Sequence, residues 1–171
     1  MDFTTIRLDP DDPQGWLWWP AFEIRVKNFV EKYLPETDPK AVASDMRQRF
    51  LTQPKLSGFW LAMDKDGRPV AHMVSWIAVV YGKAHIFVYQ AEADEKYKIT
   101  EVVKLVLAGM GEWASKLNES IPEEANRIQR VEMATWRDAE VWERYLKMLG
   151  FASVKVRSVI QFDLNIGPKN P

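Results

Sequence analysis

The sequence predicts an α/β (α+β) fold with a mixed, mostly antiparallel sheet and helices on both faces. Hydrophobic residues alternate with a period of two in residues 59–63, and residues 70–81 are rich in β-branched and aromatic side chains; both features are typical of strands. They recur with helical spacing in residues 99–117. That helix stands between strands predicted at residues 85–90 and 128–136. We therefore expect these two strands to run parallel, joined by a right-handed crossover.

The N-terminal third predicts one strand and two helices. The strand covers residues 4–8 and is followed by a cluster of turn residues. Helical spacing then predicts a first helix that begins near Pro20 and ends before Pro35. A second helix follows, with Asp38 as its N-cap and Pro39 at its first helical position.

The middle of the chain predicts an antiparallel meander of three strands. Residues 65–68 include Gly67 and form a hairpin loop between the strands at 59–63 and 70–81. The strand at residues 85–90 is the third member of the meander.

The C-terminal part predicts a last helix and a last strand. Asp138 can cap the helix at its start, and Gly150 can end it. The final strand covers residues 152–164, so the complete order is β-α-α-β-β-β-α-β-α-β. We expect a single domain over residues 1–166 and a flexible tail over residues 167–171.

The amino-acid composition argues against several classes of function. The chain has 171 residues, and 23 Lys and Arg against 24 Asp and Glu give a net charge of −1. This balance predicts neither a nucleic-acid-binding face nor a polybasic membrane signal. The chain has no cysteine and only two histidines, His72 and His85, so we expect no metal site. With no apolar run of membrane-spanning length and no signal peptide, we expect a cytoplasmic protein.

Two segments resemble the GNAT superfamily of N-acetyltransferases. Residues 139–151, with the sequence AEVWERYLKMLGF, are similar to the last helix of that family and the Leu-Gly-Phe that follows it. Residues 58–70 are similar to its hairpin of second and third strands. The resemblance implies that acetyl-CoA binds where the strands at 85–90 and 128–136 separate, and that an acetyl group passes to an amine.

The resemblance also implies a set of cofactor-binding residues. The family binds pantetheine through backbone groups of its fourth strand and pyrophosphate through a Gly-rich loop that opens the next helix. This chain has lysines where the family has glycines. The residues implied in acetyl-CoA binding are Val88, Tyr89, Gln90, Lys96, Lys98, Ile99 and Thr100.

Three residues are candidates for proton transfer. Many family members have a tyrosine on the last helix that protonates the leaving thiolate, and Tyr145 lies one residue away from that position. His85 is a candidate general base because histidine titrates near neutral pH. Glu92 could instead deprotonate an amine through a water molecule.

Trp16, Trp18 and Trp19 form an unusual cluster. In the family this region lines the acceptor side of the cleft, so the three rings could form an acceptor pocket or a surface that binds a protein. We expect at least one ring to be substantially exposed, since a short segment can point only about half of its side chains into the core.

Two functions therefore stay open. The first is an acetyltransferase that uses acetyl-CoA and acts on an amine of a small molecule or a protein. The alternative is a non-catalytic GNAT-like protein that binds a protein partner. Small proteins of this kind also occur in tailed-phage genomes, and a phage origin or a homodimer is compatible with the sequence.

Overall fold

The computed structural model describes residues 3–80, 83–97, 99–123, 127–128 and 131–133, together with Arg144 and Lys147. The chain divides into two compact units, Met1–Met133 and Ala134–Pro171. In the second unit the description is limited to Arg144 and Lys147, both helical and exposed. The elements predicted at residues 138–150 and 152–164 and the predicted tail otherwise lie outside the described residues. The single domain expected over residues 1–166 stays a prediction.

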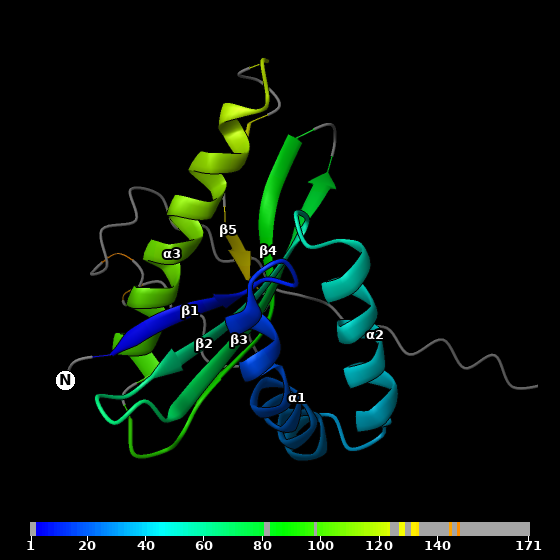
Figure 1. Cartoon of the computed structure of the whole chain (residues 1–171), viewed down its shortest axis with the longest axis vertical. Helices are drawn as coiled ribbons and strands as arrows, with labels where there is room; N and C mark the ends of the chain where they lie inside the picture. Colours follow the sequence, from blue (N-terminus) through cyan, green and yellow to red (C-terminus); the bar gives the residue numbers. More distant parts are fainter. Residues whose placement is uncertain are drawn as a thin grey trace, which may run out of the picture. The chain divides into compact units, whose positions relative to one another are not determined.

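The first unit is built on a five-stranded mixed sheet whose strand order follows the sequence, β1-β2-β3-β4-β5 (Figure 1). β1 to β4 pair antiparallel, and β5 pairs parallel with β4. The predicted parallel pair is therefore confirmed. The strands are β1 (Thr4–Leu8), β2 (Ser57–Met63), β3 (Pro69–Val80), β4 (Lys83–Ala93) and β5 (Val131–Met133).

Within the described residues, three helices cover the sheet: α1 (Pro13–Tyr33) and α2 (Pro39–Thr52) on one face and α3 (Ile99–Glu119) on the other (Figure 1). As predicted, Asp38 caps α2, and its side chain accepts a hydrogen bond from the Lys40 N–H. No helix of the described residues is long and apolar enough to span a membrane.

The predicted start of α1 near Pro20 is wrong. The helix begins at Pro13, where the Asp12 side chain accepts a hydrogen bond from the Gln14 N–H and acts as N-cap. Pro20 lies inside the helix and lacks the N–H that would bond to the Trp16 carbonyl. Trp19 and Phe22, buried on either side of Pro20, hold the helix against the sheet despite that loss.

The face under α1 and α2 contains an aromatic core. Trp19 stacks on Phe50 of α2 at 4.3 Å between ring centroids, and Phe59 of β2 meets both rings edge-on. These contacts join both helices to the central strands. The buried members of this cluster are Leu8, Trp19, Phe22, Val26, Met46, Phe50, Phe59, Leu61, Met63 and Val74.

The face under α3 is organised by Trp60. Its ring lies 6.1 Å from the ring of Trp113, and its indole Nε1–H donates to the Ser75 hydroxyl at 3.1 Å. Gly109 of α3 passes so close that a Cβ there would lie 2.9 Å from the Trp60 ring. Every residue of β2 is buried, because both faces of this strand are covered.

Candidate active site

β4 contains a β-bulge at Tyr89. Ser75 of β3 pairs with Val88 and Val74 pairs with Gln90, so Tyr89 has no register partner on β3. Among the described residues, the parallel pairing of β4 with β5 ends at Val88, opposite Met133. A bulge bends its strand and leaves the extra residue unpaired. The backbone of Tyr89 is therefore out of register with β3 at this point of the sheet.

The side chains around the bulge differ sharply in exposure. Tyr89 is 42% exposed, and its ring stacks on Trp76 of β3 at 4.6 Å. Gln90 is 2% exposed, and neither its amide nitrogen nor its amide oxygen has a hydrogen-bond partner among the described residues. Burying an amide without a hydrogen-bond partner costs folding free energy.

The turn between β4 and α3 contains no glycine and is held by contacts to other elements. The Asp94 N–H donates to the Val70 carbonyl, and the Tyr97 hydroxyl donates to Asp64 of the β2–β3 hairpin at 3.1 Å. The ring of Tyr97 also meets Phe3 edge-on at 5.4 Å. Side-chain contacts from other elements thus hold this turn in place.

Asp64 stabilises both the β2–β3 hairpin and the turn between β4 and α3. Its side chain accepts hydrogen bonds from the backbone N–H groups of Arg68 and Asp66, which close the hairpin, and from the Tyr97 hydroxyl. The Arg68 N–H, and then the Tyr97 hydroxyl, lower the pKa of Asp64 below its ordinary value of 3.8.

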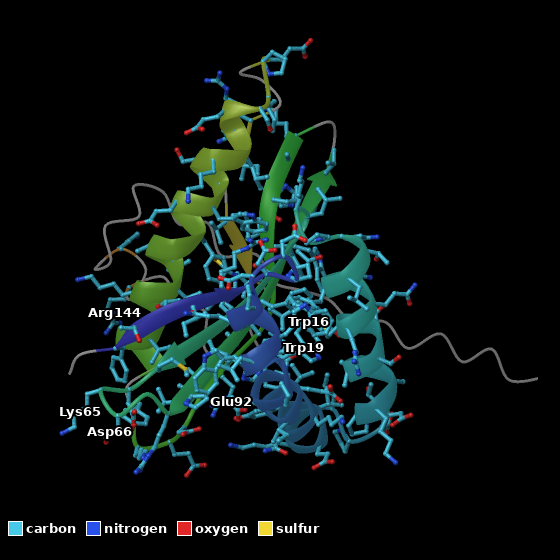
Figure 2. All side chains as sticks on the ribbon, viewed as in Figure 1. Trp16, Trp19, Lys65, Asp66, Glu92 and Arg144 are labelled. Atoms are coloured by element: carbon cyan, nitrogen blue, oxygen red, sulfur yellow. The ribbon has the colours of Figure 1, made fainter. Side chains whose placement is uncertain are left out.

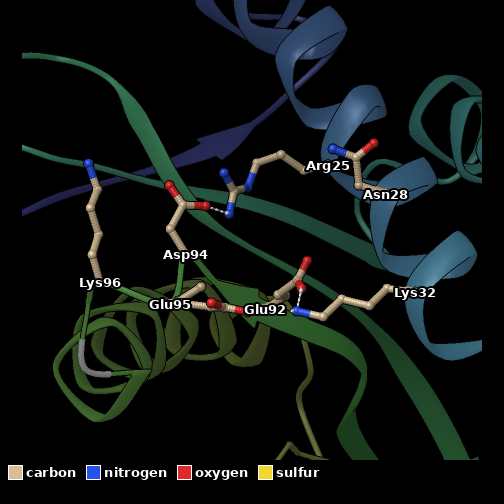
Figure 3. A pocket seen from close by; sticks show the side chains of 8 residues that line it. Arg25, Asn28, Lys32, Glu92, Asp94, Glu95 and Lys96 are labelled. Atoms are coloured by element: carbon tan, nitrogen blue, oxygen red, sulfur yellow. Dashed lines mark hydrogen bonds and ion pairs between the residues drawn. The ribbon is translucent and has the colours of Figure 1, made fainter.

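A pocket of about 440 Å³ lies between α1 and the end of β4 (Figure 3). Three ion pairs join its lining residues: Arg25 to Asp94 at 2.8 Å, and Lys32 to Glu92 at 3.6 Å and to Glu95 at 3.5 Å. Lys96 makes no ion pair with any described residue; its ammonium lies over the Tyr97 ring at 4.8 Å. The lining residues are Arg25, Asn28, Lys32, Glu92, Ala93, Asp94, Glu95 and Lys96.

Glu92, a predicted base, lies in this pocket (Figures 2 and 3). β4 continues to Ala93, three residues beyond the predicted end of the strand, so Glu92 projects from the strand itself. Its carboxylate faces Lys32. The side chain of Tyr33, and then the carboxylates of Glu92 and Glu95, raise the pKa of Lys32 above 10.5. Glu92 therefore faces a lysine that stays charged.

His72 lies beneath the same region, on β3 opposite Glu92. Its imidazole is 2% exposed and meets Phe22 and Phe29 of α1 edge-on, and neither of its nitrogens has a hydrogen-bond partner in the described part of the chain. Burial, and then the positive charge of Arg25, lower the pKa of His72 from 6.5 to about 3. This histidine is neutral at physiological pH.

His85, the other predicted base, lies toward the opposite end of β4. Its Nε2 is 3.4 Å from Oε2 of Glu132 on β5, and its side chain is 8% exposed. Seven residues separate His85 from Glu92, roughly 23 Å along a strand. The two candidate bases are therefore not brought together. Sequence reasoning missed Glu132 because its nearness to His85 depends on the register of two strands far apart in the chain.

The three tryptophans of α1 have different surroundings. Trp16 is 40% exposed, and its indole N–H donates to the Pro10 carbonyl at 2.9 Å. Trp18 is half-buried against the core, and Trp19 is only 3% exposed. Figure 2 labels Trp16 and Trp19 near α2. The expected exposure of one ring is confirmed, whereas Trp19 belongs to the core and not to a surface.

The remaining predicted site residues are described only in part. Ile99 and Thr100 form the start of α3, and Val88 is buried in β4. Lys98 and Tyr145 lie outside the described residues. The described part of the chain contains no cluster of three or more His, Cys, Asp or Glu side chains that could hold a metal ion.

The architecture is similar to that of solved acetyltransferases. A probable acetyltransferase superposes with a TM-score of 0.65 at 14% identity, covering 96% of this chain and 98% of that one. Aminoglycoside 6′-N-acetyltransferase AAC(6′)-Ih from Acinetobacter baumannii gives 0.61 at 16% identity, covering 97% and 100%. AAC(6′)-Iy, in complex with the bisubstrate analogue CoA-S-monomethyl-acetylneamine, gives 0.62 at 12% identity, covering 96% and 100%.

No protein-family model and no curated protein sequence matches the chain. At these identities the structural likeness shows the fold alone, which is the GNAT-like mixed sheet that the sequence predicts.

Proposed function

We propose that this chain transfers an acetyl group from acetyl-CoA to a primary amine of a small molecule. The observation that carries the proposal is the bulge at Tyr89, in a strand that pairs parallel with β5 up to that point. Its backbone is without a register partner where the family binds the thioester arm. Solved structures of the same fold include aminoglycoside acetyltransferases and one complex with a CoA analogue, which supports a small-molecule amine as acceptor.

The residues present fit the cofactor. Backbone groups of Val88, Tyr89 and Gln90 hold the pantetheine arm beside the bulge. Of the three cations that line the pocket, Arg25 and Lys32 already face carboxylates, whereas Lys96 has no ion pair among the described residues and can bind phosphate. The predicted phosphate set further comprises Lys98, Ile99 and Thr100 at the start of α3, where free N–H groups favour an anion.

Acetyl-CoA supplies an activated acetyl thioester. The Tyr89 N–H would donate to the carbonyl oxygen of that group and so polarise it. A base accepts the proton that the amine loses, and His85 is the base we assign, because Glu92 faces Lys32 and lies on the phosphate side of the bulge. Tyr145 remains the predicted donor of a proton to the departing thiolate.

A protein-binding role is the second candidate. Four large apolar side chains are exposed on α1: Trp16 at 40%, Leu17 at 69%, Ile24 at 59% and Tyr33 at 44%. Exposed apolar side chains that gather on one helix are typical of a surface that meets a partner. In that case the fold serves as a scaffold and its cleft carries no reaction.

Binding of CoA to the purified protein separates the two candidates. We expect acetyl-CoA to raise the melting temperature, because ligand at 100 times its Kd adds about 2.7 kcal/mol to the free energy of unfolding. Transfer is then measured as release of free thiol with a panel of polyamines and aminoglycosides. Replacing Lys96 and Lys98 together with Glu should weaken CoA binding at least tenfold and reduce its salt dependence.

Lys116→Glu is the matched control, because Lys116 is an exposed lysine in the last turn of α3, far from the turn that precedes this helix. It should leave CoA affinity unchanged. Equal loss of affinity in both variants would mean a general charge effect, and the absence of any acetyl-CoA binding by the unmodified protein would favour the protein-binding role.

A further inference from the structure

Glu132 and His85 form a pair that bridges the two parallel strands of the sheet. Nε2 of His85 lies 3.4 Å from Oε2 of Glu132, and Glu132 is in register with Phe87, two residues beyond His85. The imidazole is almost fully buried, whereas the carboxylate is 36% exposed. The strand register, and not a flexible loop, therefore sets the distance between the two groups.

The pair lies on the same face of the sheet as the bulge. The rings of Phe87 and Tyr89 both lie against Trp76, which packs on the core under α1 and α2. His85 precedes Phe87 by two residues, so its side chain points to this face as well. Four residues separate His85 from Tyr89, about 13 Å along the strand. His85 and Glu92 therefore lie on opposite sides of the bulge.

The surroundings of His85 leave one nitrogen available. Nε2 faces the carboxylate, and Nδ1 makes no hydrogen bond to a described residue. Among the described charged side chains, Lys83 lies two residues earlier on the same strand and is exposed, and the β3 partner is the uncharged Ala78. Arg49 of α2 is occupied by Asp45 and by the Trp76 ring. Glu132 is thus the acidic group that faces His85.

We propose that Glu132 is a positioning residue that keeps the proton of neutral His85 on Nε2, so that Nδ1 accepts the proton of the acceptor amine. This inference rests on the proposed acetyl transfer. A carboxylate beside one imidazole nitrogen fixes the tautomer and stabilises the imidazolium that forms. Because about 13 Å of strand separates His85 from the bulge, the proton reaches Nδ1 through a chain of bound waters.

The step balances without any further reactant. The amine nitrogen uses its electron pair to bond to the thioester carbonyl carbon, and the carbon–sulfur bond breaks with its pair on sulfur. The proton leaves the nitrogen for His85 Nδ1, and the imidazolium later releases it to solvent. Glu132 keeps its negative charge throughout.

A double-mutant cycle on kcat tests the assignment. His85→Ala should lower kcat at least a hundredfold. Glu132→Gln should lower kcat about tenfold to a hundredfold, with the KM for the amine changed less than about twofold. The double variant should be no slower than His85→Ala alone, because Glu132 acts through His85. Lys83→Gln removes a neighbouring charge that is outside the pair and should keep wild-type rates.

A spectroscopic test measures the protonation of the His85 ring nitrogens without any substrate. The chain has two histidines, so a His72→Phe background leaves a single imidazole. In ¹⁵N-histidine-labelled protein we expect one imidazole N–H signal protected from solvent exchange, assigned to Nε2 of His85. Glu132→Ala should remove that signal while the unfolding midpoint shows that the protein is still folded.

The outcomes separate this inference from the proposed function. Suppose that the protein acetylates amines but that Glu132→Gln has the wild-type kcat, or that the fold-losses of kcat in the two single variants multiply in the double variant. In either case Glu132 has no positioning role, and the proposed acetyl transfer is unaffected. If the Nε2–H signal survives Glu132→Ala, the pair does not hold the tautomer. If the wild type binds no acetyl-CoA and releases no thiol, the proposed function fails and the catalytic role of the pair fails with it.

Discussion

Acid should destabilise this protein through His72. Burial, and then the charge of Arg25, lower the pKa of His72 to about 3 in the folded protein, against 6.5 in the unfolded chain. Between these two pKa values, His72 is protonated in the unfolded state but not in the folded state. The stability that comes from keeping this imidazole neutral is complete above pH 6.5 and is lost progressively as the pH falls toward 3.

The size of the effect at pH 5 follows from linkage. Because pH 5 lies well above the folded-state pKa, the loss is set by the 1.5 units between pH 5 and the unfolded-state pKa of 6.5. At 1.36 kcal/mol per unit, this amounts to about 2 kcal/mol of the free energy of unfolding between pH 7.5 and pH 5.

Urea unfolding followed by tryptophan fluorescence at the two pH values measures this loss. His72→Phe keeps an aromatic ring between Phe22 and Phe29 and removes the titration. We expect the variant to lose about 2 kcal/mol less than the wild type between pH 7.5 and pH 5. An identical pH dependence of both proteins would refute the reasoning. So would His72 imidazole resonances that shift between pH 8 and pH 5 in the folded wild type.

Three further predictions concern packing, the β4–α3 turn and the α1 surface. Gly111→Ala should stabilise α3 by up to about 1 kcal/mol, because open space surrounds that position. Gly109→Ala should destabilise the protein by about 1 to 3 kcal/mol, because its Cβ would meet the Trp60 ring; urea unfolding measures both. Tyr97→Phe removes the hydrogen bond to the β2–β3 hairpin and should weaken CoA binding about fivefold by calorimetry, with unchanged affinity arguing against any link between turn and cofactor. Acrylamide should quench less fluorescence in Trp16→Phe than in the wild type, provided that light scattering shows a monomer; equal quenching would mean a covered ring.

The sheet was predictable because its signals are local. Each signal occupies fewer than about 25 consecutive residues: the alternation in β2, the β-branched and aromatic residues of β3, the Gly67 turn and the helical spacing of α3. The parallel pairing of β4 with β5 followed from the strand–helix–strand order, since a crossover helix leaves little other choice. The start of α1 was missed because Pro20 looks like a helix start, although Asp12 and Pro13 carry the same signal earlier in the chain.

The site was predictable only in part. His85, Tyr89 and Glu92 were identified as candidates, but their separation by the bulge depends on the register of β4 against β3. The pairing of Glu92 with Lys32 depends on how α1 packs on the sheet. Glu132 can be recognised as a site residue only from its contact with His85. Such contacts join residues 47 to 60 positions apart, and no local pattern encodes them.

The anchoring of the β4–α3 turn has a consequence for local unfolding. Arg25 donates to the carbonyls of Pro69 and Val70 and also pairs with Asp94, so one guanidinium joins α1, the start of β3 and the turn. Segments tied in this way open together and not one at a time. The backbone amides of Asp94 and Tyr97 should therefore exchange with solvent deuterium at the rate of the hairpin amides, and Arg25→Lys should accelerate all of them together.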